Sequence, residues 1–425
     1  MTKTIFRWVW VGILIVSQIA LAEPPDSTIQ LSELIREALQ NNPDLESALQ
    51  GWQAAEAQVP QAGALPDPLL VVNMMNVPIN TFSFSQEPMT SKQVGLVQKF
   101  PFPGKQGLKE SIARENATVA QARYSELRIQ LIKALKTTYF DLFFIDKSIE
   151  TVKKNIAVLK QFVRIAETKY SVGSGLQQDV LRAQVELSKM IDRHINLQKK
   201  RDATEAQLNR ILNRPAVNPV GATEELVFKP FEYEFDSLKT LADANRPLLK
   251  AWQAMIRQSE KKTKLAKKDY WPDFSVGIVY SQRNVLNNGT GGIDYLSGLV
   301  NVRLPLYFWR KQGKAVEESK FNQVSIQKKY DDVRNQIYSG LDARLNDVLK
   351  NERLINLFES GIIPQASQSL NSAIAGYQTD KVDFLTLLTN QINLFNFELD
   401  YYRILRDHHK GAAEIEALTG VALKY

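Results

Sequence analysis

The chain has 425 residues, no cysteine and a formal net charge of +7. Without cysteine it can have no disulfides, no thiol catalysis, no cysteine-bound metal and no lipid on an amino-terminal cysteine. The basic residues are spread along helical segments and form no basic block with interleaved aromatic residues, so nucleic acid is not an expected partner.

The first 22 residues have the pattern of a secretory signal peptide. Lys3 and Arg7 precede an apolar run, and the small residues Ala20 and Ala22 mark a cleavage site. We expect cleavage after Ala22; a retained membrane anchor is the alternative. No later run reaches about 18 apolar residues, so no transmembrane helix is predicted.

The remaining chain contains two copies of one unit. The segment Tyr170–Gln184 returns without a gap as Tyr377–Gln391, 207 residues later. An internal repeat of this kind indicates a duplicated architecture. We therefore divide the chain into a first structural repeat (23–215), a linker or equatorial segment (216–240) and a second structural repeat (241–425).

Each repeat is predicted to contain a helix, two strands, a very long helix and a returning helix. In the first repeat, the apolar spacing predicts a helix over Ser32–Gly63, strands over Pro68–Met75 and Val94–Phe100, and a long helix over Lys105–Tyr170. The same order starts again at Pro247. The fold is therefore expected to be mainly α, with a small β part.

The strands and their exits carry the repeat as well. Phe100-Pro101-Phe102 returns as Leu304-Pro305-Leu306 after 204 residues, and Lys105-Gln106-Gly107 returns as Lys311-Gln312-Gly313 after 206. The later strands alternate between an apolar and a mixed face, which suits a membrane barrel strand and also a half-buried soluble sheet. Four strands are too few to close a membrane barrel, for which about eight is the minimum, so a membrane interpretation requires an oligomer.

The long helix is predicted to form a coiled-coil hairpin with the helix that follows it. At about 1.5 Å per residue it would reach roughly 100 Å. Its last part has the 3-4 apolar spacing of a coiled-coil seam, and the returning segment from Val180 has the same spacing. In the second repeat, Pro364 is expected to bend the descending arm, because proline removes a backbone hydrogen bond.

These features together resemble the TolC family of outer-membrane efflux proteins. The resemblance rests on the duplicated element order, on the turn with Tyr170, Gly173 and Asp179, and on the exit Phe100-Pro101-Phe102-Pro103-Gly104. It covers nearly the whole mature chain. The motifs Leu65-Pro66-Asp67-Pro68 and Phe100–Lys105 look most like the heavy-metal cation efflux (CzcC- and CusC-like) branch.

The resemblance implies a homotrimer in the outer membrane. Three chains would contribute four strands each to a 12-stranded β-barrel, which a periplasmic α-helical barrel would continue. Members of the family work with an inner-membrane pump, here of the RND type, and with a periplasmic adaptor that docks on the helical tips. The tips of this chain are Val172, Gly173, Ser174 and Gly175 in the first hairpin and Thr379, Lys381 and Val382 in the second.

The resemblance also implies a periplasmic gate. Asp179 matches the family's aspartate and Tyr377 its tyrosine, whereas Val382 stands where the family has an arginine. Asp380 and Asp383 are the further acidic candidates, because three copies of each would form carboxylate rings that favour cations. The alternative is that these two residues only form the turn and start the helix.

A passive export duct is the function that this pattern favours, with heavy-metal cations as the expected substrate and drugs or proteins as alternatives. A soluble periplasmic coiled-coil scaffold is the alternative from a different class. We find no catalytic motif and expect no enzyme, no cofactor and no bound metal. His194 is expected to be a packed residue of the seam, and Met74, Met75 and Met89 are expected to be apolar filler.

Overall fold

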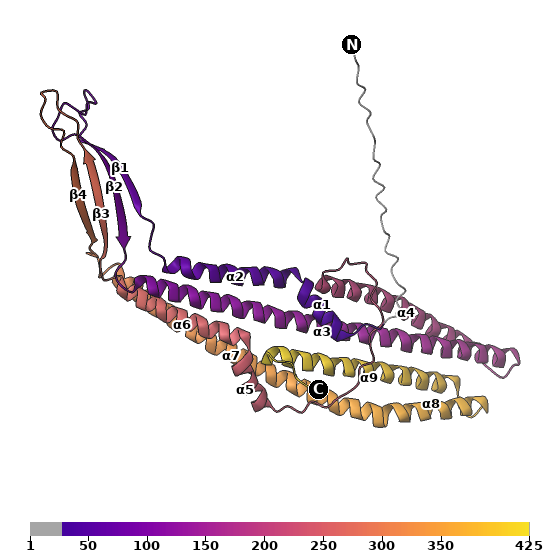
Figure 1. Cartoon of the computed structure of the whole chain (residues 1–425). Helices are drawn as coiled ribbons and strands as arrows, with labels where there is room; N and C mark the ends of the chain where they lie inside the picture. Colours follow the sequence, from indigo (N-terminus) through magenta and orange to yellow (C-terminus); the bar gives the residue numbers. More distant parts are fainter. Residues whose placement is uncertain (1–27, 425) are drawn as a thin grey trace, which may run out of the picture.

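The computed structural model describes residues 28–424; the expected signal peptide lies outside this range. A long helical body carries a small sheet at one end and two helical hairpins at the other (Figure 1). The first repeat consists of α1 (Leu31–Asn41), α2 (Pro43–Gly63), β1 (Leu69–Met75), β2 (Ser91–Phe100), α3 (Lys105–Ser171) and α4 (Gln177–Leu212). The second consists of α5 (Phe235–Asn245), α6 (Pro247–Lys268), β3 (Asp273–Gln282), β4 (Tyr295–Arg303), α7 (Gln312–Leu357), the π-helical turn η1 (Phe358–Ile362), α8 (Ile363–Gln378) and α9 (Phe384–Thr419). The predicted mainly α fold with a small β part and the duplicated order of elements are confirmed.

The segment predicted as one helix over Ser32–Gly63 is two helices. Asn42 is extended, and its side-chain oxygen accepts hydrogen bonds from the backbone N–H groups of Asp44 and Leu45, both at 3.1 Å. Pro43 follows at the first helical position, where its fixed φ suits a helix start. The chain therefore ends α1 and restarts as α2 at this point.

The helix α5 begins at Phe235, inside the range 216–240 that was expected to join the repeats. Its fully buried residues Leu238 and Ala242 belong to the same core cluster as Ile337 and Leu341 of α7. Both α5 and α1 have 11 residues and are followed by a one-residue break and a proline. We conclude that α5 is the second copy of α1.

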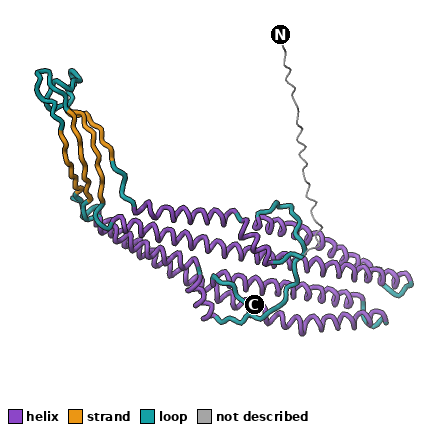
Figure 2. Tube along the Cα trace, in the orientation of Figure 1, coloured by secondary structure: helices purple, strands orange, loops and turns teal. Residues whose placement is uncertain are grey.

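The long helices set the length of the molecule. With 67 residues, α3 extends roughly 100 Å at about 1.5 Å per residue. Its counterpart runs as helix from Gln312 to Gln378 (Figure 2). It contains the π-helical turn η1, which ends two residues before Pro364. The missing N–H of proline disturbs the regular hydrogen-bond pattern at this place. A bend was expected at Pro364, and the feature that the structure has there is this π-helical turn.

The sheet joins the two repeats. Its strands are antiparallel in the order β1-β2-β3-β4, and residues such as Leu96 and Ile278 lie opposite each other across the central pair. Large apolar side chains at even-numbered positions point to one face and are exposed to solvent: Leu70, Val72, Met74, Val94, Leu96, Val276, Ile278, Tyr280, Leu296, Val300 and Val302. The described helices lie beyond the end of the sheet and do not cover this face (Figure 1).

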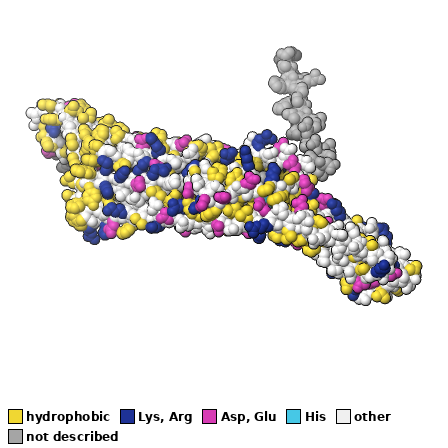
Figure 3. Space-filling model, turned by 90° about the horizontal axis from the view of Figure 1, so that it is seen from below, with side chains coloured by type: hydrophobic (Ala, Val, Ile, Leu, Met, Phe, Trp, Pro, Cys, Tyr) yellow, Lys and Arg dark blue, Asp and Glu magenta, His cyan; other side chains and the backbone are white. Residues whose placement is uncertain are grey.

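The surface of the molecule differs between its two ends. Hydrophobic side chains gather over the sheet, whereas lysine, arginine and acidic side chains are scattered along the helical body (Figure 3). Among residues 28–424, no helix has an apolar stretch long enough to cross a membrane.

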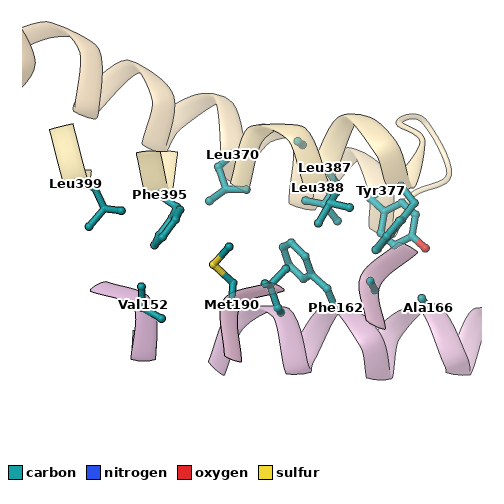
Figure 4. Close-up of a cluster of buried hydrophobic side chains, with 14 residues drawn as sticks. Val152, Phe162, Ala166, Met190, Leu370, Tyr377, Leu387, Leu388, Phe395 and Leu399 are labelled. Atoms are coloured by element: carbon teal, nitrogen blue, oxygen red, sulfur yellow. The ribbon is translucent and has the colours of Figure 1, made fainter. Parts of the chain in front are cut away.

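The two hairpins pack against each other. A buried cluster between them contains Val152, Phe162 and Met190 from the first hairpin and Leu370 and Phe395 from the second (Figure 4). The seam predicted within each hairpin is therefore part of a larger core that α3, α4, α8 and α9 share. Deep inside it, Gln391 donates a hydrogen bond of 2.8 Å from its side-chain nitrogen to the side-chain oxygen of Asn155.

Candidate gate at the hairpin tips

Two turns of the same construction lie at the end of the molecule opposite the sheet. In the first, Gly173 has a φ of 78°, and the equivalent Asp380 in the second has a φ of 60°. The backbone N–H of Ser174 donates to the carbonyl of Lys169 at 2.9 Å, and that of Lys381 donates to the carbonyl of Gly376 at 2.9 Å. Glycine and aspartate are residues that tolerate left-handed backbone, so the two sequences form one turn type.

Tyr377 is buried where the second turn meets the first hairpin, with 6% of its surface exposed. Its ring packs edge-on against Phe384 at 5.5 Å, and Phe384 packs against Phe162 of α3 at 6.4 Å. Burial raises the pKa of Tyr377, and the negative charges of Asp179 and Asp380 raise it further. The phenol therefore stays neutral at physiological pH and can donate a hydrogen bond.

Asp179 lies in the first turn of α4, where the positive end of the helix dipole favours a carboxylate. Its charge acts on Tyr377, but in the described part of the chain no hydrogen bond joins the two side chains. The structure thus brings the expected gate pair to the same end of the molecule, on neighbouring hairpin tips, without a hydrogen bond between the two side chains within one chain.

Lys169 connects the two tips, and the sequence analysis did not identify it. Its ammonium group donates a hydrogen bond of 2.8 Å to the carbonyl of Tyr377, forms an ion pair with Asp380, and lies 4.5 Å from the ring centroid of Tyr377. Only 17% of its side chain is exposed. The repeat offers a signal in retrospect, since Lys169 stands where the second repeat has Gly376.

Asp383 starts α9. Its carboxylate accepts a hydrogen bond of 2.7 Å from the backbone N–H of Thr386, and bonding to Thr386 holds the pKa of Asp383 below its ordinary value. This is the helix-start geometry considered from the sequence. Among residues 28–424, no three histidine or acidic side chains come close enough together to hold a metal ion.

The expected docking residues differ in exposure. The side chain of Val172 is 71% exposed, and Gly173, Ser174, Thr379 and Lys381 are exposed as well. Gly175 and Val382 are half-buried. Val382 packs over Gly376, where an added Cβ would come within 2.5 Å of it. Leu176, 66% exposed beside Val172, was not among the expected residues.

The chain as a whole is similar to known efflux proteins. The family described as outer membrane efflux protein matches residues 34–214 and 238–421. The chain is 20% identical over 408 residues to the cobalt-zinc-cadmium resistance protein CzcC of Cupriavidus metallidurans, covering 89% of this chain and 87% of that protein. It is 23% identical to the toxin and drug export protein A of Aggregatibacter actinomycetemcomitans over 52% of this chain, and it spans only about half of that relative, 47%. The crystal structure of CusC shares its fold, with a TM-score of 0.79 at 14% identity over 94% of both chains.

Proposed function

Because the chain belongs to the outer membrane efflux protein family, we propose that it forms the outer-membrane duct of a three-part export system. It is an outer-membrane protein whose helical part lies in the periplasm, and it is not an enzyme. In the proposed system, an inner-membrane pump of the RND type delivers substrate through a periplasmic adaptor. The duct itself is passive.

The observation that carries the proposal is the uncovered apolar face of the sheet at the end of a helical body roughly 100 Å long. Lipid is the environment in which such a face is stable, and a sheet in lipid must leave no edge unpaired. Because β1 and β4 end the four-stranded sheet of one chain, several chains must close it. Three chains would give 12 strands, and the helices would continue the barrel as a tunnel.

The hairpin tips are the proposed site of closure and docking. Asp179 and Tyr377 lie on the tips of the two hairpins, where the charge of Asp179 acts on Tyr377, and Lys169 of the first hairpin forms an ion pair with Asp380 of the second. The exposed turn residues, Val172 above all, are the proposed contacts for the adaptor. Asp380 and Asp383 together would give rings of carboxylates at the entrance, and such rings favour cations.

Heavy-metal cations are the proposed substrate. The similarity to a cobalt-zinc-cadmium resistance protein extends over nearly the full length of both chains. The similarity to a toxin and drug export protein, which covers about half of each chain, supports drug or protein export as the second candidate.

Two experiments test these proposals. The processed protein should fractionate with the outer membrane and run as a trimer in detergent until it is heated; recovery as a soluble periplasmic monomer would support the scaffold alternative and refute the duct. Deletion of the gene should increase sensitivity to cobalt, zinc or cadmium, and a plasmid copy should restore resistance. Sensitivity only to drugs would assign the duct to the second candidate.

A further inference from the structure

A buried lysine fastens α3 to the neighbouring strand where the repeats join. The Lys105 side chain is 7% exposed, and its Nζ contacts a carboxylate oxygen of Asp273 at 2.9 Å and one of Asp269 at 3.1 Å. The same oxygen of Asp273 accepts a hydrogen bond of 2.9 Å from the backbone N–H of Phe102. The ring of Phe102 stacks on Trp271 at 5.2 Å. We call these four contacts the junction clamp; they tie the exit of β2 to the start of β3.

The internal repeat contains a second lysine and a second aspartate at the equivalent positions, and these two residues do not contact each other within the chain. Lys311 matches Lys105, and Asp67 matches Asp273, both at a spacing of 206 residues. Both are exposed, and within the described chain neither has an ion pair. Their apolar companions are exposed too, with Leu306 at 65% in the place of Phe102 and Leu65 at 51% in the place of Trp271.

The sheet order explains why this second set stays open. Asp67 precedes β1, Lys311 follows β4, and these strands are the opposite edges of the sheet. In the junction clamp, by contrast, the lysine follows β2 and the aspartate begins β3, which pair directly. In the repeat, β4 is equivalent to β2 and β1 is equivalent to β3. A pair of β4 with β1 would therefore be equivalent to the pair of β2 with β3, and the sheet order allows it only if β1 belongs to a second chain.

We propose that Lys311 binds Asp67 of the partner subunit and that this second junction clamp holds β4 against the partner's β1. The inference rests on the proposed oligomeric duct and assigns residues to its contacts between chains. Opposite charges meet, and Leu306 packs on Leu65 of the partner subunit. The equivalent register places Leu304 opposite Pro68 of the partner subunit, because Phe100 lies opposite Phe274 within the chain. Both strands then keep their even-numbered apolar residues on one face.

Two differences between the repeats define the controls. The exit of β4 is two residues longer than that of β2, and it contains Arg310 as a competing cation. The second carboxylate, Asp269, has Gly63 as its equivalent at the same spacing. The clamp between chains therefore has one carboxylate for each lysine.

The cysteine-free chain allows a direct test with a short thiol–thiol crosslinker. Asp67→Cys combined with Lys311→Cys should give covalent dimers and trimers on a denaturing gel, whereas each single variant should remain a monomer. Lys105→Cys with Asp273→Cys calibrates the reagent, because it should crosslink within one chain. Asp67→Cys with Arg310→Cys is the matched control.

The outcomes separate the clamp from the proposed function. An intact trimer that crosslinks through Arg310, or through neither residue while the calibration pair reacts, would overturn the clamp and leave the duct standing. A wild-type protein that is monomeric in gentle detergent would refute both.

Charge exchange gives an independent measurement. Lys311→Asp and Asp67→Lys should each lower the temperature at which the trimer dissociates, because like charges then meet at the edge. The double variant should recover most of the loss. If the two losses add instead, the residues do not contact each other and the proposal fails.

Discussion

Replacing Lys169 with methionine is the sharpest test of the proposed closure at the hairpin tips. Methionine keeps most of the apolar stem and removes the ammonium group that bonds the Tyr377 carbonyl and Asp380. A hydrogen bond from a charged donor contributes about 1.5–3 kcal/mol. The ion pair adds at most about 1 kcal/mol, because Asp380 is 71% exposed. Since these contacts share one group, we expect a loss of about 2 kcal/mol in each chain.

This loss of free energy is large enough to shift the equilibrium of the proposed gate. If three chains open together, it amounts to about 6 kcal/mol and shifts the closed-to-open equilibrium roughly 10⁴-fold. Lys169→Met should therefore raise single-channel conductance in planar bilayers and make cells permeable to large antibiotics. The amount of assembled trimer should not change, because Lys169 is remote from the sheet.

A lysine in the second turn provides the control. Lys381 is exposed and forms no ion pair in the described chain, so Lys381→Met removes the same charge without the contacts and should conduct like the wild type. Equal conductance of wild type and Lys169→Met, with normal assembly, would show that the tips are held by other residues.

Three further predictions follow from buried groups. Asp179→Ala with Tyr377→Phe should raise conductance without reducing the trimer if the two residues bond between chains, at about 1–3 kcal/mol for each pair; unchanged conductance would place the constriction elsewhere. Gln391→Leu should lower thermal stability, since Asn155 loses its buried partner, and adding Asn155→Leu should recover most of the loss in the same melting experiment. Burial lowers the pKa of His409 to about 4, so between that pH and about pH 6.5 the unfolded chain binds a proton at His409 and the folded chain does not. The free energy of unfolding should therefore be unaffected by His409 above about pH 6.5 and fall by about 1.4 kcal/mol per pH unit from there toward pH 4. A melting series of His409→Gln should lack this part of the pH dependence.

The duplicated order of elements was predictable from sequence because the repeat keeps local signals. Apolar periodicity predicts helices and strands without knowledge of partners, and the paired motifs at Tyr170 and Tyr377 gave the two hairpins their turns. The break at Asn42 and Pro43 also has a local signal, a side chain that caps a helix before a proline. The prediction of a single helix over Ser32–Gly63 did not include this break, because the apolar spacing continues through it.

Long-range contacts required the tertiary structure. The sequence placed Asp179 and Tyr377 at equivalent turns, but it could not show that Lys169 forms an ion pair with Asp380. The partner of a long, flexible lysine side chain depends on which acceptors the packing of the two hairpins brings close to it. The core that the two hairpins share could not be predicted either. The apolar spacing of a coiled-coil seam is the same in the sequence whether the seam packs against one helix or against three. The sequence alone determined the units and their order. The tertiary structure determined which units contact each other. Within one chain it leaves β1 and β4 as the edges of the sheet, and another chain is their proposed partner.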